Sequence, residues 1–350
     1  MAITLQDLTD DPALYLYEFD KDAAIFQPMT RDAFERSIFL DGRIKHGKRQ
    51  SLRVPLSQLL QAWAGPAPAE RRIGWIFHVA QCGSTLLARA LDHPGRSLVL
   101  REPAALRRLG VIAGADSAHE NAVSSESFAR MLSVTQSLLG KRWEQAAPVI
   151  AKANVPVNFI ADEVMAHDPG ASAICLYFPL ADYVAAILRT EGHVRWTEGV
   201  FEELRLAGSP YAAGHVPLTP AGKAAALWFA QMKAFAALIE KYPAVRSLEA
   251  GHFFSNPAST VEVAAGLFGV SLDPGEAEEI AASELFASYS KNPALDYDPE
   301  VREAREAEAK ARLAGEIAEA VEWARAAKAR HGLPDALGRQ LVGAAAPLLP

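Results

Sequence analysis

The chain has 350 residues, of which 50% are apolar and 22% charged, a composition that excludes a largely disordered protein. Acidic residues outnumber basic ones by 42 to 35, which argues against a general nucleic-acid-binding surface. No apolar run is long enough to span a membrane, and the first residues lack the basic start of a secretory signal. The two cysteines, Cys82 and Cys175, lack metal-ligand spacing, so we expect no structural metal. Together these features predict a cytoplasmic protein without a membrane partner.

Residues 1–70 predict an N-terminal extension made of a hairpin and short helices. Two apolar runs, 13–20 and 24–29, are separated by two polar residues and predict the hairpin. Thr30 is positioned to cap the helix that follows it. Residues 43–53 form a basic cluster in an otherwise acidic chain, typical of a solvated surface and also a candidate for recognising an acidic acceptor.

From residue 71 onward, short β-branched or aromatic runs alternate with helical patterns, which predicts βαβ units and a mostly parallel, buried sheet. The expected strands are residues 73–79, 98–101, 148–152, 173–178 and 245–249. A capping residue followed by proline predicts helices that begin after Thr219, Asn256, Asp273 and Asp298. The sequence therefore indicates a three-layer α/β domain over residues 71–290.

Residues 291–350 predict a helical C-terminal extension. The stretch 300–331 is charged, alanine-rich and helical in pattern. Residues 337–350 are apolar but interrupted by glycine and proline, a pattern that leaves docking and fraying both open.

The most informative segment follows the first expected strand of the α/β domain. Gly83 stands at the tip of a loop, and a helix is expected to begin near Ser84. The backbone N–H groups of Gly83, Ser84 and Thr85 then point at one place, where the helix dipole favours a phosphate or sulfate group. The alternative is an ordinary strand-to-helix turn with Ser84 as its cap. The loop lacks the Gly-Lys-Ser/Thr of a Walker A motif.

The loop Gln81-Cys-Gly-Ser-Thr-Leu-Leu87 resembles the phosphosulfate-binding loop of the sulfotransferase superfamily. Further segments resemble motifs of that superfamily in the same order, namely residues 91–94 with 98–103, 149–154, 173–188 and 247–269. The similarity covers residues 71–290 and is strongest to the bacterial sulfotransferase-like and tyrosylprotein sulfotransferase branch. It implies a P-loop NTPase-like fold, 3′-phosphoadenosine 5′-phosphosulfate as donor, and sulfuryl transfer to a hydroxyl on a small molecule or peptide.

The resemblance also implies roles for individual residues. Glu102 matches the base that takes the acceptor proton, and Lys152 matches the lysine near the bridging oxygen of the donor. The structural alternatives are a Glu102 carboxylate that pairs with Arg101 or caps the helix after Pro103, and a surface lysine at a strand end. The residues implied to hold the donor are Gln81, Cys82, Gly83, Ser84 and Thr85.

The sequence departs from the family pattern at the donor site. Gln81 stands where the family has arginine or lysine, and it retains only an amide donor. Phe178 and Ala186 occupy the positions that match the arginine and serine of the donor's 3′-phosphate site, and neither side chain can bind that group. The cosubstrate site therefore relies on Arg189, Arg195 or the basic cluster, takes a different nucleotide, or takes none.

Two other functions remain open at this point. One is a non-catalytic protein of the same fold that binds a nucleotide, an anion or a protein partner. The other is a P-loop kinase, against which the missing Walker lysine and the lack of a magnesium-binding aspartate pattern count. Cys82 lacks an evident histidine partner for cysteine catalysis, and His215 is the next candidate to line the acceptor pocket. The sequence leaves the acceptor and homo-oligomer formation open.

Overall fold

The computed structural model describes residues 3–44, 50–63, 71–114, 124–212, 218–289, 292–296 and 299–350. The chain divides into two compact units. The first unit consists of residues 1–76, 88–172 and 265–271, and the second of residues 77–87, 173–264 and 272–350. Within the described ranges, no helix is both long enough and apolar enough to cross a membrane.

A three-stranded antiparallel sheet opens the first unit, in the order β1 (Leu14–Asp20), β2 (Ala23–Pro28) and β3 (Leu52–Pro55). The turn between β1 and β2 is tight, because Asp20 pairs with Ala23. The expected N-terminal hairpin is therefore confirmed. Helix α2 (Arg31–Arg36) follows, and the Thr30 hydroxyl accepts a hydrogen bond from the Ala33 N–H at 3.1 Å, as predicted for a cap.

The central sheet has five strands in the order β5-β6-β4-β7-β8. Their bounds are β4 (Ile73–His78), β5 (Leu98–Arg101), β6 (Val149–Lys152), β7 (Ala173–Tyr177) and β8 (Val245–Glu249). The pairs β4–β6, β5–β6 and β7–β8 are parallel, and every residue of β5, β6 and β7 is buried. All five strands predicted from the sequence are present, and their ends differ from the prediction by no more than one residue.

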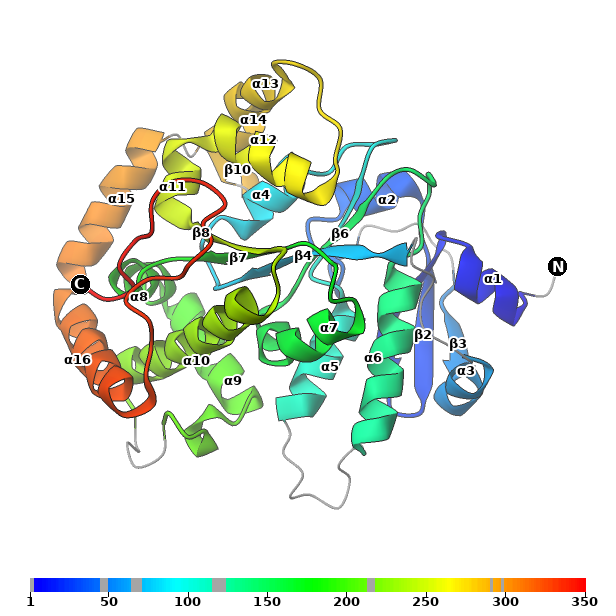
Figure 1. The fold of residues 1–350 in the computed structure, drawn as a ribbon, viewed down its shortest axis with the longest axis horizontal. Helices are drawn as coiled ribbons and strands as arrows, with labels where there is room; N and C mark the ends of the chain where they lie inside the picture. Colours follow the sequence, from blue (N-terminus) through cyan, green and yellow to red (C-terminus); the bar gives the residue numbers. More distant parts are fainter. Residues whose placement is uncertain are drawn as a thin grey trace. The chain divides into compact units, whose positions relative to one another are not determined.

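Helices cover both faces of the sheet, which confirms the predicted three-layer α/β class. In the second unit, α10 (Pro220–Lys241) lies on one side of β7 and β8, and α11 (Ala250–Ser255) lies on the other (Figure 1). The remaining elements up to residue 296 are α1 (Leu5–Asp10), α3 (Leu56–Ala62), α4 (Ser84–Ala90), α5 (Ala104–Gly114), α6 (Ser125–Leu139), η2 (Val155–Ile160), α7 (Ala161–His167), α8 (Leu180–Ile187), α9 (Glu191–Glu203), η3 (Leu206–Gly208), α12 (Pro257–Phe268), α13 (Glu276–Ala282), α14 (Glu284–Ala287), β9 (Ser288–Tyr289) and β10 (Asn292–Asp296).

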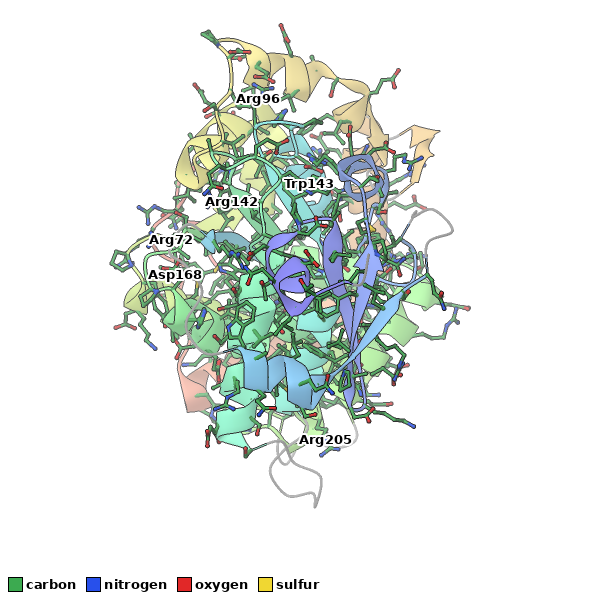
Figure 2. The ribbon with its side chains drawn as sticks, turned by 90° about the vertical axis from the view of Figure 1, so that its right-hand side faces the viewer. Arg72, Arg96, Arg142, Trp143, Asp168 and Arg205 are labelled. Carbon is green, nitrogen blue, oxygen red and sulfur yellow. The ribbon has the colours of Figure 1, made fainter. Side chains whose placement is uncertain are left out.

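An ion pair fixes the approach to β4 in the first unit. Arg72 Nε lies 2.9 Å from Asp168 Oδ2, and the two side chains meet next to the end of α7 (Figure 2). The Asp168 carboxylate also accepts a hydrogen bond from the Gly170 N–H at 3.2 Å. Because both side chains of the ion pair are partly exposed, its contribution is mainly to the local path of the chain.

The helix starts predicted from proline pairs have mixed outcomes. Thr219 caps α10, since its hydroxyl accepts from the Gly222 N–H at 3.0 Å, and α12 begins at Pro257 as expected. The expected start after Asp273 is wrong. Helix α13 begins later, after Gly275 at φ 84°, and the Glu276 carboxylate accepts from the Asp273 N–H at 2.8 Å. Asp298 lies outside the described residues.

The C-terminal helical stretch is two helices rather than one. Helix α15 (Pro299–Arg312) ends one residue before Leu313, and α16 (Ala314–His331) follows it. The local sequence signal for this break is Gly315, in the first turn of α16, which the sequence analysis did not use.

The segment after α16 docks on the second unit. Leu341 N–H donates to the Ser247 carbonyl at 2.7 Å, and Ser247 N–H donates to the Arg339 carbonyl at 3.0 Å, so this segment runs along the edge of β8. Farther on, Leu348 is fully buried, and its carbonyl accepts from the Leu180 N–H at 3.0 Å. Of the two outcomes that the sequence left open, docking is the one observed.

Candidate functional site

The loop predicted to bind phosphate follows β4 and belongs to the second unit. It begins where the Val79 N–H donates to the Leu176 carbonyl at 3.1 Å, and α4 starts at Ser84. Gly83 has a φ of 85°, and a Cβ there would lie 2.7 Å from Cζ of Phe254. Only glycine fits both the conformation and the space. The sequence analysis placed Gly83 at the tip of the loop but did not anticipate the contact with Phe254.

The donors expected of this loop are present. Ser84 and Thr85 are buried, and the Thr85 hydroxyl has no hydrogen-bond partner among the residues that the structure describes. Within the same residues, no hydrogen bond uses the backbone N–H groups of Gly83, Ser84 and Thr85. Buried donors of this kind normally find a partner, so the loop is equipped to bind an anion.

The side chain of Cys82 is bound within the protein and does not contribute a donor to the loop. Its thiol donates to the Val79 carbonyl at 2.9 Å and lies 3.7 Å from the Leu176 carbonyl, and the residue is fully buried. Of Cys82, only the backbone is therefore able to serve as a donor in the loop. This position agrees with a packed loop residue rather than with a nucleophile.

Gln81 is held by a histidine that the sequence analysis did not identify. The Gln81 Nε2 atom lies 3.4 Å from His193 Nε2, and His193 Nδ1 lies 3.2 Å from the Ala186 carbonyl oxygen. Because that carbonyl can only accept, Nδ1 carries the proton and Nε2 accepts from the Gln81 amide. Gln81 has a φ of 67°, a conformation that is uncommon for a residue other than glycine. No local pattern around His193 indicated this role.

Aromatic rings occupy the region expected to hold a 3′-phosphate, and one guanidinium lies beside them. Phe178 is 8% exposed, and its ring centroid lies 6.3 Å from that of Phe254. Arg302 from α15 stacks over Phe254 with its Cζ 4.3 Å from the ring centroid. Ala186 contributes only the carbonyl that binds His193. Phe178 and Ala186, which depart from the family pattern in sequence, therefore provide no side-chain donor for a 3′-phosphate.

Arg189 lies just beyond the end of α8. Its carbonyl accepts from Arg312 Nη2 at 2.8 Å. Burial raises the pKa of the nearby Glu306 carboxyl, and the charges of Arg302 and Arg189 oppose that rise. The described hydrogen bonds do not link Arg189 to the loop 81–85, and its role toward a donor remains a prediction.

The first unit brings Glu102 and Lys152 together. Strands β5 and β6 are parallel with Arg101 opposite Lys152, and the Glu102 N–H donates to the Lys152 carbonyl at 2.8 Å. The Lys152 ammonium forms an ion pair with Glu102 Oε1. Side-chain exposure is 1% for the lysine and 20% for the glutamate, so the carboxylate faces solvent and the ammonium does not. Glu102 also has a φ of 58°.

The described ion pairs join Glu102 to Lys152 and Arg101 to Asp92, and so do not support the structural alternative in which Glu102 pairs with Arg101. Arg101 is 1% exposed and turns away, with Nη1 placed 2.5 Å from Asp92 Oδ2. The alternative of a surface lysine at position 152 is wrong, since Lys152 is fully buried. Glu102 follows the end of β5 and has a φ of 58°, so its side chain leaves the chain in a different direction from that of Arg101.

The N-terminal extension contributes to the surroundings of this pair, which the sequence analysis missed. Leu40 N–H donates to the Arg101 carbonyl at 2.7 Å, so the extension crosses the end of β5. The Phe39 ring centroid lies 5.7 Å from Lys152 Nζ and 3.9 Å from Arg43 Cζ. Hydrogen bonds to Asp41 raise the pKa of Arg43 above its ordinary value, and the charge of Glu102 adds to the rise.

The described residues contain no group of histidine, cysteine and carboxylate side chains able to hold a metal ion. His215, the second candidate for the acceptor pocket, and residues 45–49 of the basic cluster lie outside the described residues.

Among known proteins, only solved structures match the chain. No family model and no curated protein sequence matches the chain. The crystal structure of a sulfotransferase from Alicyclobacillus acidocaldarius is similar, with 16% identity, 75% of this chain and 95% of that chain covered, and a TM-score of 0.38. The sulfotransferase domain from the curacin biosynthetic pathway has 11% identity, covers 69% of this chain and 87% of its own, and gives a TM-score of 0.39.

At these TM-scores the two structures support no conclusion about donor, acceptor or activity. Both are described as sulfotransferases. The structure itself establishes an α/β fold with a five-stranded central sheet.

Proposed function

We propose that this chain transfers a sulfuryl group from a phosphosulfate nucleotide to a hydroxyl on a small molecule or peptide. The observation that carries the proposal is the ion pair of Glu102 and Lys152 at the carboxyl ends of two adjacent parallel strands, where ligand sites of open α/β sheets form. The positive φ of Glu102 supports it, because strained residues other than glycine cluster at functional sites.

The pair supplies two of the groups that sulfuryl transfer needs. As the acceptor oxygen bonds to sulfur, the bond between sulfur and the phosphate oxygen breaks, and its electron pair stays with that phosphate. Glu102, whose carboxylate is partly exposed, takes the proton from the acceptor hydroxyl. Lys152 supplies a buried positive charge that stabilises the negative charge on the leaving phosphate.

The loop 81–85 supports a donor with a 5′-phosphosulfate but offers less to a 3′-phosphate. Gly83, Ser84 and Thr85 present backbone and hydroxyl donors, whereas Phe178 packs against Phe254. We therefore expect 3′-phosphoadenosine 5′-phosphate and adenosine 5′-phosphate to bind with similar affinities in calorimetric titrations. An intact 3′-phosphate site would instead separate them by about 1.5–3 kcal/mol, the value of a hydrogen bond to a charged group.

The substitution Glu102→Gln tests the proposal most directly. The glutamine side chain retains an oxygen that can accept from the buried Lys152, but it cannot take the acceptor proton. Turnover is expected to fall at least about a hundredfold while nucleotide affinity stays unchanged. Glu144→Gln, at an exposed glutamate of the same unit, is the control and is expected to leave both quantities unchanged.

Three outcomes contradict the assigned role of Glu102. Unchanged turnover places the base elsewhere, and His215 is then the next residue to substitute. If Glu102→Gln lowers the melting temperature as well as turnover, Glu102 has a structural role and holds the Lys152 ammonium in place. Nucleotide binding by the native chain without turnover of any phosphosulfate donor favours the second candidate function, a non-catalytic binding protein, which the apolar surroundings of Phe178 also favour.

A further inference from the structure

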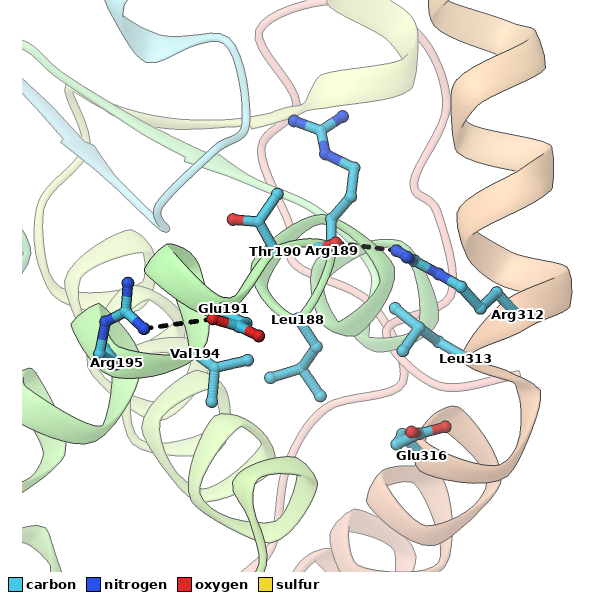
Figure 3. Close-up of a pocket in the computed structure, with 9 residues that line it drawn as sticks. All are labelled: Leu188, Arg189, Thr190, Glu191, Val194, Arg195, Arg312, Leu313 and Glu316. Carbon is cyan, nitrogen blue, oxygen red and sulfur yellow. Dashed lines mark hydrogen bonds and ion pairs between the residues drawn. The ribbon is translucent and has the colours of Figure 1, made fainter.

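An open surface depression of 520 Å³ lies in the second unit, at the connection between α8 and α9 and the junction of α15 with α16. Leu188, Val194 and Leu313 line its apolar part, and their side chains gather in the middle of the site (Figure 3). Small-molecule sites in proteins commonly have volumes of about 300–1,000 Å³ and combine apolar walls with a few polar groups. The depression is thus large enough for a compact organic molecule.

The charged residues around this apolar part are mainly basic. Three arginines, Arg189, Arg195 and Arg312, line the depression together with two glutamates, Glu191 and Glu316. The N-terminus of α9, a helix of 13 residues capped by Thr190, lies in the same lining and adds positive potential. The local charge therefore favours an anion with a single negative charge.

The arginines are able to meet such a ligand at little cost. Arg195 Nη1 lies 3.5 Å from Glu191 Oε2, and both side chains are largely exposed, so this ion pair is weak and opens readily (Figure 3). Arg312 Nη2 donates to the Arg189 carbonyl at 2.8 Å, which orients the Arg312 guanidinium. A guanidinium has five N–H donors, so Arg312 retains donors for a ligand oxygen.

We propose that this depression, named here the arginine pocket, binds an organic anion whose apolar body rests on Leu188, Val194 and Leu313. These side chains lie between Arg195 and Arg312 (Figure 3), and the sulfate or carboxylate group of the ligand meets one of the two arginines. The apolar part of the lining distinguishes this ligand from a bare inorganic ion. The binding needs neither a nucleotide nor catalysis, so it stands apart from the proposed transfer reaction.

The test is calorimetric titration of the full chain, without nucleotide, with 4-nitrophenyl sulfate. Inorganic sulfate lacks the apolar body and 4-nitrophenol lacks the sulfate group, and both are expected to bind at least about tenfold more weakly. One of the substitutions Arg195→Gln and Arg312→Gln is expected to weaken 4-nitrophenyl sulfate binding about tenfold or more, which identifies the arginine that meets the sulfate group. Arg36→Gln is the matched control, because Arg36 is also an exposed arginine in an i,i+4 ion pair, and it is expected to bind as the native chain does.

Several results overturn the arginine pocket. Absence of 4-nitrophenyl sulfate binding does so, as does binding that neither arginine substitution weakens. Equal affinity for 4-nitrophenyl sulfate and inorganic sulfate removes the role of the apolar residues. If Arg195→Gln instead weakens 3′-phosphoadenosine 5′-phosphate selectively over adenosine 5′-phosphate, the arginines serve the 3′-phosphate of a nucleotide. None of these results bears on the turnover change expected for Glu102→Gln, so the two proposals fail separately.

Discussion

Substitution of Asp92 tests how the N-terminal extension is attached to β5. The Asp92 side chain is 3% exposed, and its two oxygens bind two arginines: Arg31 Nη2 lies 2.6 Å from Oδ1, and Arg101 Nη1 lies 2.5 Å from Oδ2. Arg101 also donates to the carbonyls of Phe34, at 2.5 Å, and Ser37, at 2.8 Å, which belong to the end of α2 and its C-cap. Asp92 therefore neutralises the charge that holds α2 in place.

The expected cost of Asp92→Asn follows from this burial. The substitution keeps the shape of the side chain and removes its charge, while the Arg101 side chain remains 2% exposed and Arg31 15% exposed. Loss of one partner of a buried ion pair typically destabilises a protein by about 3–5 kcal/mol. We expect a loss in that range for the first unit.

Urea unfolding followed by tryptophan fluorescence measures this loss. Asp32→Asn is the matched control, because Asp32 is 66% exposed and pairs with Arg36 on the surface of α2. The control is expected to change the free energy of unfolding by less than about 0.5 kcal/mol. A loss below about 1 kcal/mol for Asp92→Asn, similar to that of an exposed ion pair, would refute the assigned role of this carboxylate.

Two further predictions concern Gly83 and Lys141. Gly83→Ala and Gly95→Ala both place alanine at a positive φ, which costs about 1–2 kcal/mol. Of the two, only Gly83→Ala brings the new Cβ against another side chain, that of Phe254. Gly83→Ala is therefore expected to lower the melting temperature more than Gly95→Ala, and equal changes would argue against the close packing of Phe254. Burial lowers the pKa of Lys141 to about 7, so between pH 7 and the ordinary lysine pKa the unfolded chain binds a proton that the folded chain does not. As pH rises from 7 to 9, the free energy of unfolding of the native chain should therefore increase relative to that of Lys141→Met, by up to about 1.4 kcal/mol per pH unit. Urea unfolding at several pH values measures this, and a difference between the two chains that does not change with pH would contradict it.

The parts of the fold that the sequence predicted are those with local signals. Strands such as Leu98–Arg101 are continuous apolar runs, and the tight loop at Gly83 combines a strand end, a glycine and helix-capping hydroxyls within a few residues. The meeting of Glu102 and Lys152 could be anticipated only from the order of family motifs, because strand register depends on pairing across the sheet.

The missed parts depend on contacts between residues far apart in the chain. Phe39 packs near Lys152, and His193 orients Gln81, yet neither residue lies in a pattern that indicates its partner. Arg101 pairs with Asp92 because its side chain lies on the face of β5 that Asp92 also reaches. The sequence could not assign that face, because both faces of the strand were expected to be buried.

The chain segment that runs along β8 has a consequence for the order of folding during synthesis. β8 is an edge strand of the central sheet, and the backbone groups of Ser247 on its open side are paired by Arg339 and Leu341. A ribosome releases β8 long before it releases those residues, so the nascent sheet passes through a stage with an exposed strand edge. Such an edge pairs readily with strands of other chains. We expect nascent chains that stall before Arg339 to be more prone to self-association than chains that extend past Leu341, since the partner for this edge lies far downstream of β8.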